Sequence, residues 1–101
     1  MVFAALEYPE TYEDAHLSLV AYLRTRFPKL DSGLQCDSWI WIWFGDDKVA
    51  IDTFTSMKHL VKSSRSGEHV DAVIRALIQQ YTVKVYPTPE LEPHEPEEYE
   101  S

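Results

Sequence analysis

The chain has 101 residues, of which 45% are hydrophobic and 26% charged, as is typical of one globular domain with a single modest core. No apolar run exceeds six residues, and the N-terminus lacks the basic start and apolar core of a signal peptide, so we expect a soluble, cytoplasmic protein that does not cross a membrane. The net charge of −8 argues against nucleic-acid binding, and the single cysteine, Cys36, excludes an intramolecular disulfide and a cysteine-based metal cluster.

The first predicted elements are an edge strand and an amphipathic helix. Residues 2–6 are apolar enough to add an edge strand to a sheet. Thr11 can then cap the free amides of a helix, and acidic residues follow in its first turn. The pattern predicts a helix over residues 12–27 that Pro28 ends. Its apolar residues recur at spacings of three and four: Tyr12, Ala15, Leu19, Val20, Leu23 and Phe27.

Residues 28–37 are interpreted as a linker into a strand with two apolar faces. A strand sends successive side chains to opposite faces, so the run at 39–44 places its aromatic and aliphatic residues on different sides. One face carries Trp39, Trp41 and Trp43, which are all the tryptophans of the chain, and the other carries Ile40, Ile42 and Phe44.

A turn at residues 45–47 and a return strand at 49–54 predict a hairpin. With Asp46 and Asp47 as a two-residue loop, Trp43 would pair with Ala50 and Trp41 with Asp52. A three-residue loop would instead place the aliphatic residues of the return strand beside the tryptophans. We prefer the first register because it gathers the branched aliphatic residues on one face and leaves Asp52 on the other.

The remaining pattern predicts a third strand, a second helix and a last short strand. Residues 57–62 suit a strand, with a helical turn as the alternative, and residues 82–86 suit a strand that Pro87 ends. The order helix, three strands, helix, strand predicts an α+β two-layer sandwich, with both helices on one face of a mainly antiparallel sheet of three to five strands. The second helix has one apolar stripe, formed by Val70, Val73, Ile74, Leu77, Ile78 and Tyr81.

The acidity of the chain is concentrated in residues 87–101. This segment holds six glutamates, four of the six prolines, and no lysine or arginine. Such a composition cannot bury enough apolar surface to offset its ordering entropy, so we predict a globular domain over 1–86 and a disordered tail with polyproline-like stretches over 87–101. The tail is either solubilising, or an arm that binds a basic partner or folds back on the protein.

The tryptophan face is the main candidate for function. If both helices cover the aliphatic face, three uncovered indoles would expose roughly 450–750 Å², above the ~300–600 Å² of a typical largest patch on a monomer. A second copy of the chain, another protein, a flat ligand, or the chain's own linker and N-terminus could cover it. Because tryptophan is favoured at interface hot spots, we expect a protein interface. The predicted contact residues are Trp39, Trp41, Trp43, Asp52 and Phe54.

Residues 53–67 contain basic residues and no acid, and they lead into a predicted helix N-terminus, where free amides attract anions. One reading is a site for a small anion or an acidic peptide, and the other is an ordinary helix cap after a solvated strand. We also expect that the acidic tail could dock on this segment. The residues of the predicted anion site are Lys58, Lys62, Arg65, Ser66 and Gly67.

No catalytic or metal-binding motif stands out. His59 and His69 lack a neighbouring nucleophile and a metal-ligand spacing, and Cys36 would need a histidine brought to it by the fold. We therefore expect no enzyme activity, no cofactor and no metal. The predicted function is a protein-interaction module, of inhibitor, immunity or adaptor type or a homodimer. The alternative is a small-molecule or anion-binding domain, or a minor enzyme, that uses the indoles with Asp52 or His59.

Overall fold

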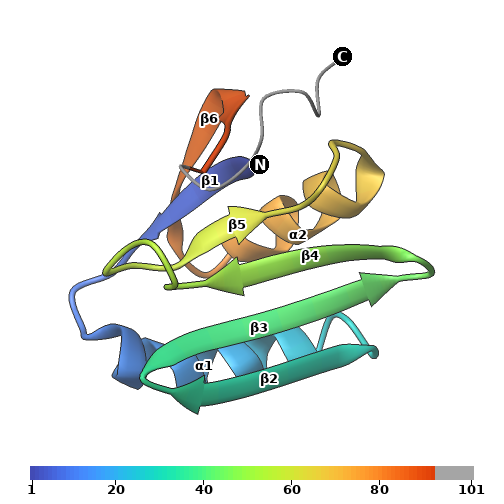
Figure 1. Cartoon of the computed structure of the whole chain (residues 1–101). Coiled ribbons are helices and arrows are strands. Elements are labelled where there is room, and N and C mark those ends of the chain that lie inside the picture. The colour runs from blue at the N-terminus through green and yellow to red at the C-terminus, as the bar shows by residue number, and fades with distance from the viewer. Residues whose placement is uncertain (93–101) are drawn as a thin grey trace.

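A computed structural model describes residues 1–92 and has an α+β fold (Figure 1). The six strands form one antiparallel sheet in the order β2-β3-β4-β5-β1-β6. The elements are β1 (Val2–Glu7), α1 (Tyr12–Arg24), β2 (Leu30–Gln35), β3 (Asp37–Phe44), β4 (Asp47–Asp52), β5 (Leu60–Lys62), α2 (Glu68–Ile78) and β6 (Thr82–Glu90).

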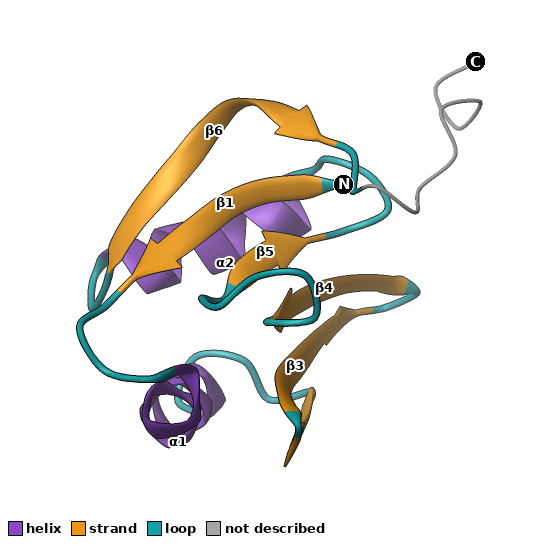
Figure 2. Ribbon diagram, turned by 60° about the vertical axis from the view of Figure 1, so that its left-hand side comes forward, coloured by secondary structure: helices purple, strands orange, loops and turns teal. Residues whose placement is uncertain are grey.

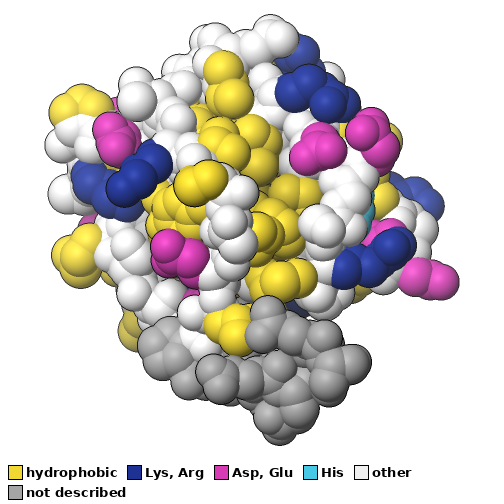
Figure 3. Space-filling model, turned by 90° about the horizontal axis from the view of Figure 1, so that it is seen from above, with side chains coloured by type: hydrophobic (Ala, Val, Ile, Leu, Met, Phe, Trp, Pro, Cys, Tyr) yellow, Lys and Arg dark blue, Asp and Glu magenta, His cyan; other side chains and the backbone are white. Residues whose placement is uncertain are grey.

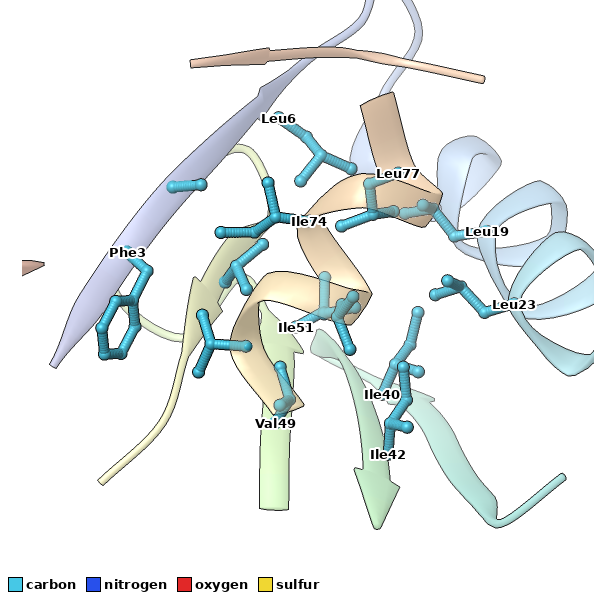
Figure 4. Packing of buried hydrophobic residues seen from close by; sticks show 14 of the residues in the cluster. Phe3, Leu6, Leu19, Leu23, Ile40, Ile42, Val49, Ile51, Ile74 and Leu77 are labelled. Atoms are coloured by element: carbon cyan, nitrogen blue, oxygen red, sulfur yellow. The ribbon is translucent and has the colours of Figure 1, made fainter. Parts of the chain in front are cut away.

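Both helices pack on the aliphatic face of the sheet, which confirms the predicted two-layer arrangement (Figure 1). The core between the layers draws on both helices and on β1, β3, β4 and β5, and its side chains converge in Figure 4. Among its fully buried members are Leu6, Leu19, Leu23, Ile40, Ile42, Val49, Ile51, Val61, Val73 and Leu77.

Helix α1 begins as predicted and ends three residues earlier. The hydroxyl of Thr11 accepts a hydrogen bond from the amide of Asp14 at 3.3 Å. The helix ends at Arg24, and the following amides bond to the carbonyls of Tyr22 and Leu23. Pro28 disfavours helical geometry in the residue before it, so the chain leaves the helix before reaching the proline.

The sheet has more strands than the sequence predicts. The predicted linker contains strand β2, and the predicted third strand is shortened to β5. Residues 2–6 do form a strand, but β1 lies inside the sheet between β5 and β6 rather than at an edge. Strand β2 has apolar residues at only two of its six positions, so the propensity signal for it is weak, and its pairing depends on β3.

Strand β6 continues beyond Pro87, so the predicted strand end is wrong. An edge strand tolerates proline because one side of its backbone makes no sheet hydrogen bonds. The pairing of β6 with β1 is irregular here: Ala4 lies opposite Val85, but Val2 lies opposite Glu90, so β6 has extra residues between the two pairs. Figure 2 shows β6 arching away from β1 over this stretch. Residues 87–92 of the predicted tail are therefore strand and loop, and residues 93–101 lie outside the described part of the chain.

The surface on the β6 side of the molecule also carries hydrophobic side chains (Figure 3). Val85, on this edge strand, is 48% exposed. Because β6 and β2 are the two edges of the sheet, this surface lies far from the tryptophans of β3.

The β3–β4 hairpin keeps the predicted faces but not the predicted partners. Gly45 has a φ of +62° and takes the first place in a two-residue loop, where hairpin turns need a positive φ. Trp41 therefore lies opposite Ala50 and not Asp52, which faces Trp39. The register differs from the prediction by two residues, and a shift of two leaves every side chain on its predicted face.

The β2–β3 hairpin turns at Cys36, which has a φ of +62° and an exposed thiol. This backbone region is unfavourable for residues with a Cβ atom. We predict that Cys36→Gly raises the free energy of unfolding by about 0.5–1 kcal/mol, after subtracting the greater freedom of glycine in the unfolded chain. Urea unfolding would measure the change. Cys36→Ala, which removes the thiol but keeps the Cβ atom, is the matched control, and equal stability of the two variants would contradict the prediction.

Candidate functional site

Three indole rings form a row along β3, and we call Trp39, Trp41 and Trp43 the tryptophan ladder. The ring centroids of Trp39 and Trp41 lie 4.6 Å apart in a tilted arrangement, and those of Trp41 and Trp43 lie 6.4 Å apart, edge to face. Each side chain is half-buried. The rings therefore shield one another in part, and the ladder exposes less than the ~450–750 Å² of three free indoles.

Neighbouring strands fix the rings in place. A Cβ atom on Gly33 would lie 2.5 Å from the indole of Trp39, so this ring lies directly over the glycine of β2. The indole nitrogen of Trp43 donates to a carboxylate oxygen of Asp31 at 3.3 Å. The ammonium of Lys48 lies 4.1 Å from the ring centre of Trp41, within the range of a cation–π contact.

No described element of the chain covers the ladder. Both helices lie on the other face of the sheet, and the two segments that could have covered the indoles, the predicted linker and the N-terminus, are strands β2 and β1 of the sheet itself. The ladder is therefore an aromatic row on the open face of the sheet, with Lys48 above it and Asp31 beside it.

A buried ionic cluster lies on the same face. The ammonium of Lys62 is 2.7 Å from a carboxylate oxygen of Asp52 and 2.6 Å from one of Glu92, and all three side chains are less than 10% exposed. The hydroxyl of Thr55 donates to Glu92 at 2.8 Å, and the amide of Phe54 donates to Asp52 at 3.3 Å. We call Asp52, Lys62 and Glu92 the ionic triad.

The charge of Lys62 is maintained against its burial. Burial disfavours the charged ammonium, but the hydrogen bonds and charges of Asp52 and Glu92 outweigh this effect, so the pKa of Lys62 lies above its usual value. Phe54, also predicted as a contact residue, is 53% exposed, and its ring centre lies 6.0 Å from the Lys62 ammonium. Asp52 is thus an ion-pair partner of Lys62. Its side chain is buried, so a substrate in solvent could not exchange a proton with it.

The cations of the predicted anion site have separate partners within the chain. The ammonium of Lys58 donates to the carbonyls of Tyr8 and Glu10 at 2.7 and 2.9 Å. Arg65 forms a two-point pair with Asp47, at 3.0 and 2.6 Å. Ser66 is exposed, and Gly67 is the N-cap residue before α2. The structure thus does not gather Lys58, Lys62 and Arg65 around the first turn of α2. One residue of the predicted acidic tail, Glu92, does contact one of these cations, Lys62.

A chain of buried polar side chains links α1 to the sheet, and little in the sequence points to it. The hydroxyl of Ser38 lies 2.6 Å from Nδ1 of His16 and 2.7 Å from Nε2 of His59. Nδ1 of His59 in turn lies 2.7 Å from the hydroxyl of Tyr8. Burial lowers the pKa of His16, and burial followed by the charge of His16 lowers that of His59 to about 4.

This polar chain is a structural feature rather than a reaction centre. A serine beside an imidazole is the arrangement of an activated nucleophile. Ser38 and His59 are both completely buried, however, so a substrate has no surface by which to reach them. In the sequence, His16 lies next to the apolar stripe of α1, which is a weak sign of a buried histidine. Ser38 and His59 come from separate strand ends that only the fold brings together.

Two of the surface cavities formed by residues within 1–92 lie away from the tryptophans, Asp52 and His59. One is lined by residues 9–13 with Met57 and Lys58, and the other by Arg26, Phe27, Ala72, Arg75, Ala76 and Gln79. Within residues 1–92, no group of three histidine, cysteine, aspartate or glutamate side chains is placed to hold a metal ion. No helix in this range is long and apolar enough to cross a membrane.

Comparison of the chain with protein-family models, with curated proteins and with solved structures finds no match.

Proposed function

We propose that this chain is a non-enzymatic interaction module that binds an extended, proline-containing segment of a partner protein across the tryptophan ladder. The observation that carries the proposal is the row of three half-buried indoles on the face of the sheet that neither helix covers. An uncovered aromatic row of this kind is typical of an interaction surface.

The small area of the ladder favours a narrow ligand over a folded one. Most of each indole is covered, so the three together present at most about 250 Å². A stable interface between two folded proteins, including two copies of this chain, buries about 800 Å² on each partner. Charged side chains border the ladder, with Asp31 on one side and the ionic triad on the other, so its apolar surface does not extend far across the sheet.

The shape of the ladder matches a polyproline II segment. Residues 39–43 of β3 span about 14 Å along the strand, which is the length of four to five residues of polyproline II at about 3.1 Å each. Such helices bind aromatic rows because they are already extended and lose little entropy on binding. The ammonium of Lys48 over Trp41 provides a partner for a carboxylate next to the prolines. We therefore propose an acidic, proline-containing ligand.

We predict that Trp41→Ser weakens the binding of such a ligand at least tenfold, or about 1.4 kcal/mol, because Trp41 is the central ring of the ladder. The probe is a set of synthetic peptides with proline at every third position and glutamates between, titrated into the full chain by calorimetry. Leu17→Ser is the matched control, since Leu17 is 72% exposed on α1, away from the ladder. Failure of every peptide to bind, or equal binding by the Trp41 variant, would refute the proposal.

Self-association is a separate outcome that the tryptophans can report. All of them lie in the ladder, so their emission follows this face alone. If two copies covered each other's ladders, quenching by acrylamide would increase on dilution and light scattering would show a dimer. That result would replace the peptide ligand by a second copy of the chain. Quenching that stays constant on dilution agrees with the proposal.

A further inference from the structure

We infer that two copies of this chain join edge to edge along β2 and pack their α1 helices against each other, so that the two sheets become one. Such a dimer goes beyond the proposed function, because it uses the edge of the sheet and leaves both tryptophan ladders uncovered. It is supported by an unprotected edge strand, by a backbone register that can pair with itself, and by a side of α1 that is complementary to its own copy.

Strand β2 is the unprotected edge of the sheet. Edge strands are commonly blunted by prolines, by lysines or by a bend that turns them away from other chains. The other edge, β6, contains Pro87, Pro89 and Lys84, and it arches away from β1 (Figure 2). Strand β2 reads LDSGLQ, without proline or lysine, and pairs with β3 in an unbroken register. Its outer side can therefore accept another strand.

The register identifies the backbone groups on the outer side of β2. The amide of Trp43 donates to the carbonyl of Lys29 at 3.0 Å, so Trp43 turns its backbone towards β2. Residues of an antiparallel pair alternate between those that exchange hydrogen bonds with the neighbouring strand and those that do not. Asp31 and Gly33 therefore bond to β3, and the residues between them turn their N–H and C=O groups outwards. These outward residues are Leu30, Ser32 and Leu34.

A strand with this pattern can pair with a second copy of itself. In an antiparallel pair centred on Ser32, each Leu30 lies opposite the partner's Leu34. Every outward backbone group of β2 is then used, which gives about six hydrogen bonds. On the ladder face, Asp31 lies opposite the partner's Gly33, so no two carboxylates meet across the pair. Leu34, which is 40% exposed in the single chain, gains an apolar neighbour.

Helix α1 presents one side to the same edge. It lies over β2 and β3 (Figure 1), and the hydroxyl of Tyr22 donates to the carbonyl of Ala76, so the Tyr22 side of the helix faces α2. With about 3.6 residues per turn, four residues lie within about 40° of the opposite direction, towards the free edge of β2. We call these residues the α1 flank: Glu13, Leu17, Val20 and Arg24.

The middle of α1 lies close to the middle of β2. The hydroxyl of Tyr12, the first residue of α1, donates to the carbonyl of Cys36, just after the end of β2. Only residues 25–29 separate the end of α1 from the start of β2. The two elements therefore run side by side in opposite directions, and a two-fold axis through Ser32 also passes close to the centre of the α1 flank.

Two copies of the α1 flank complement each other about this axis. Each helix lies between β2 and β3, so the two helices would run antiparallel about 10 Å apart, which is a normal distance for packed helices. An alignment that places Leu17 opposite the partner's Val20 also places Glu13 opposite the partner's Arg24. The contact then has an apolar centre and an ion pair at each end. It also covers Leu17, which is 72% exposed in the single chain.

Sedimentation of the full chain, from nanomolar to high micromolar concentration, tests the dimer. We expect a reversible monomer–dimer equilibrium that Leu17→Glu weakens at least about tenfold. Ser32→Pro should weaken it to a similar extent, because it removes an outward amide that the single chain does not use. Ile78→Glu is the matched control, since Ile78 is 53% exposed on α2, and it should behave as the unaltered chain. A chain that stays monomeric, or a dimer that Leu17→Glu leaves unchanged, would overturn the inference.

Exchanging the charges of the α1 flank tests the antiparallel alignment. Glu13→Arg and Arg24→Glu should each weaken the dimer about fivefold, because like charges then meet at both ends. The double variant E13R/R24E should restore it, although it places an unfavourable charge at each end of α1. A mixture of the two single variants should form heterodimers, in which opposite charges meet again. A double variant as weak as the single ones would overturn this alignment.

Tryptophan quenching separates this dimer from one that buries the ladders. Because the edge dimer leaves the indoles uncovered, quenching by acrylamide should stay constant while the dimer dissociates on dilution. An increase in quenching on dissociation would overturn edge pairing and show that one ladder covers the other. Failure of the proline-containing peptides to bind an intact edge dimer would instead refute the proposed function and leave this inference standing.

Discussion

Replacing Lys62 with methionine is expected to lower the free energy of unfolding by about 3 kcal/mol at pH 7. Removing one member of a buried ion pair leaves its partner charged and unpaired, which costs about 3–5 kcal/mol. Without the ammonium of Lys62, the carboxylates of Asp52 and Glu92 would remain in a site where each is less than 10% exposed. We place the effect at the lower end because Glu92 can turn towards solvent while Asp52, held within the sheet, cannot.

Urea unfolding of Lys62→Met should be compared with that of Arg65→Met. The Arg65 side chain is 66% exposed and pairs with Asp47, so removing it should cost at most about 1 kcal/mol, as for other surface ion pairs. An effect of Lys62→Met no larger than that of Arg65→Met would show that solvent, rather than Lys62, stabilises the carboxylates.

The elements predicted most accurately are those whose own residues carry the signal. The stripe of α2 and the alternation of β3 are periodic over a whole element, and both faces of the β3–β4 hairpin follow from them. Strand β2 lacks such a pattern and forms because β3 offers it a partner. Pro87 lies within β6 because an edge strand does not use every backbone amide for sheet hydrogen bonds. The sequence alone does not show which strand is at the edge.

The candidate site was predictable in part for the same reason. Alternation alone places the three tryptophans on one face, whereas the ionic triad joins residues far apart in the sequence. The contacts of His59 with Ser38 and Tyr8 likewise depend on the order of the strands. A charge pattern indicates which residues are available for pairing, but the sheet topology decides which of them meet. This is why Lys58, Lys62 and Arg65 looked like one basic site and have three separate sets of partners.

Acidification is expected to destabilise the protein before its carboxylates are protonated, because His59 is buried in its neutral form. The pKa of His59 is about 4 in the folded protein, against about 6.5 in an unfolded chain. Above pH 6.5 the imidazole is neutral in both states. As the pH falls below 6.5, the unfolded state takes up a proton that the folded state does not, so stability is lost. Between pH 7 and pH 5 this difference amounts to about 2 kcal/mol.

Two measurements check this expectation. Urea unfolding at pH 7, 6 and 5 should show the loss, and His59→Gln, which does not titrate, should show a smaller change over the same range although it is less stable at pH 7. The lowered pKa of His16 acts in the same direction and accounts for the part that persists in the variant. Nuclear magnetic resonance of the His59 ring should give a midpoint near pH 4. A midpoint near 6.5 would contradict the expectation, because it would mean that solvent reaches this imidazole. The row of hydrogen-bonded side chains from Tyr8 to His16 would then open far more readily than its burial implies.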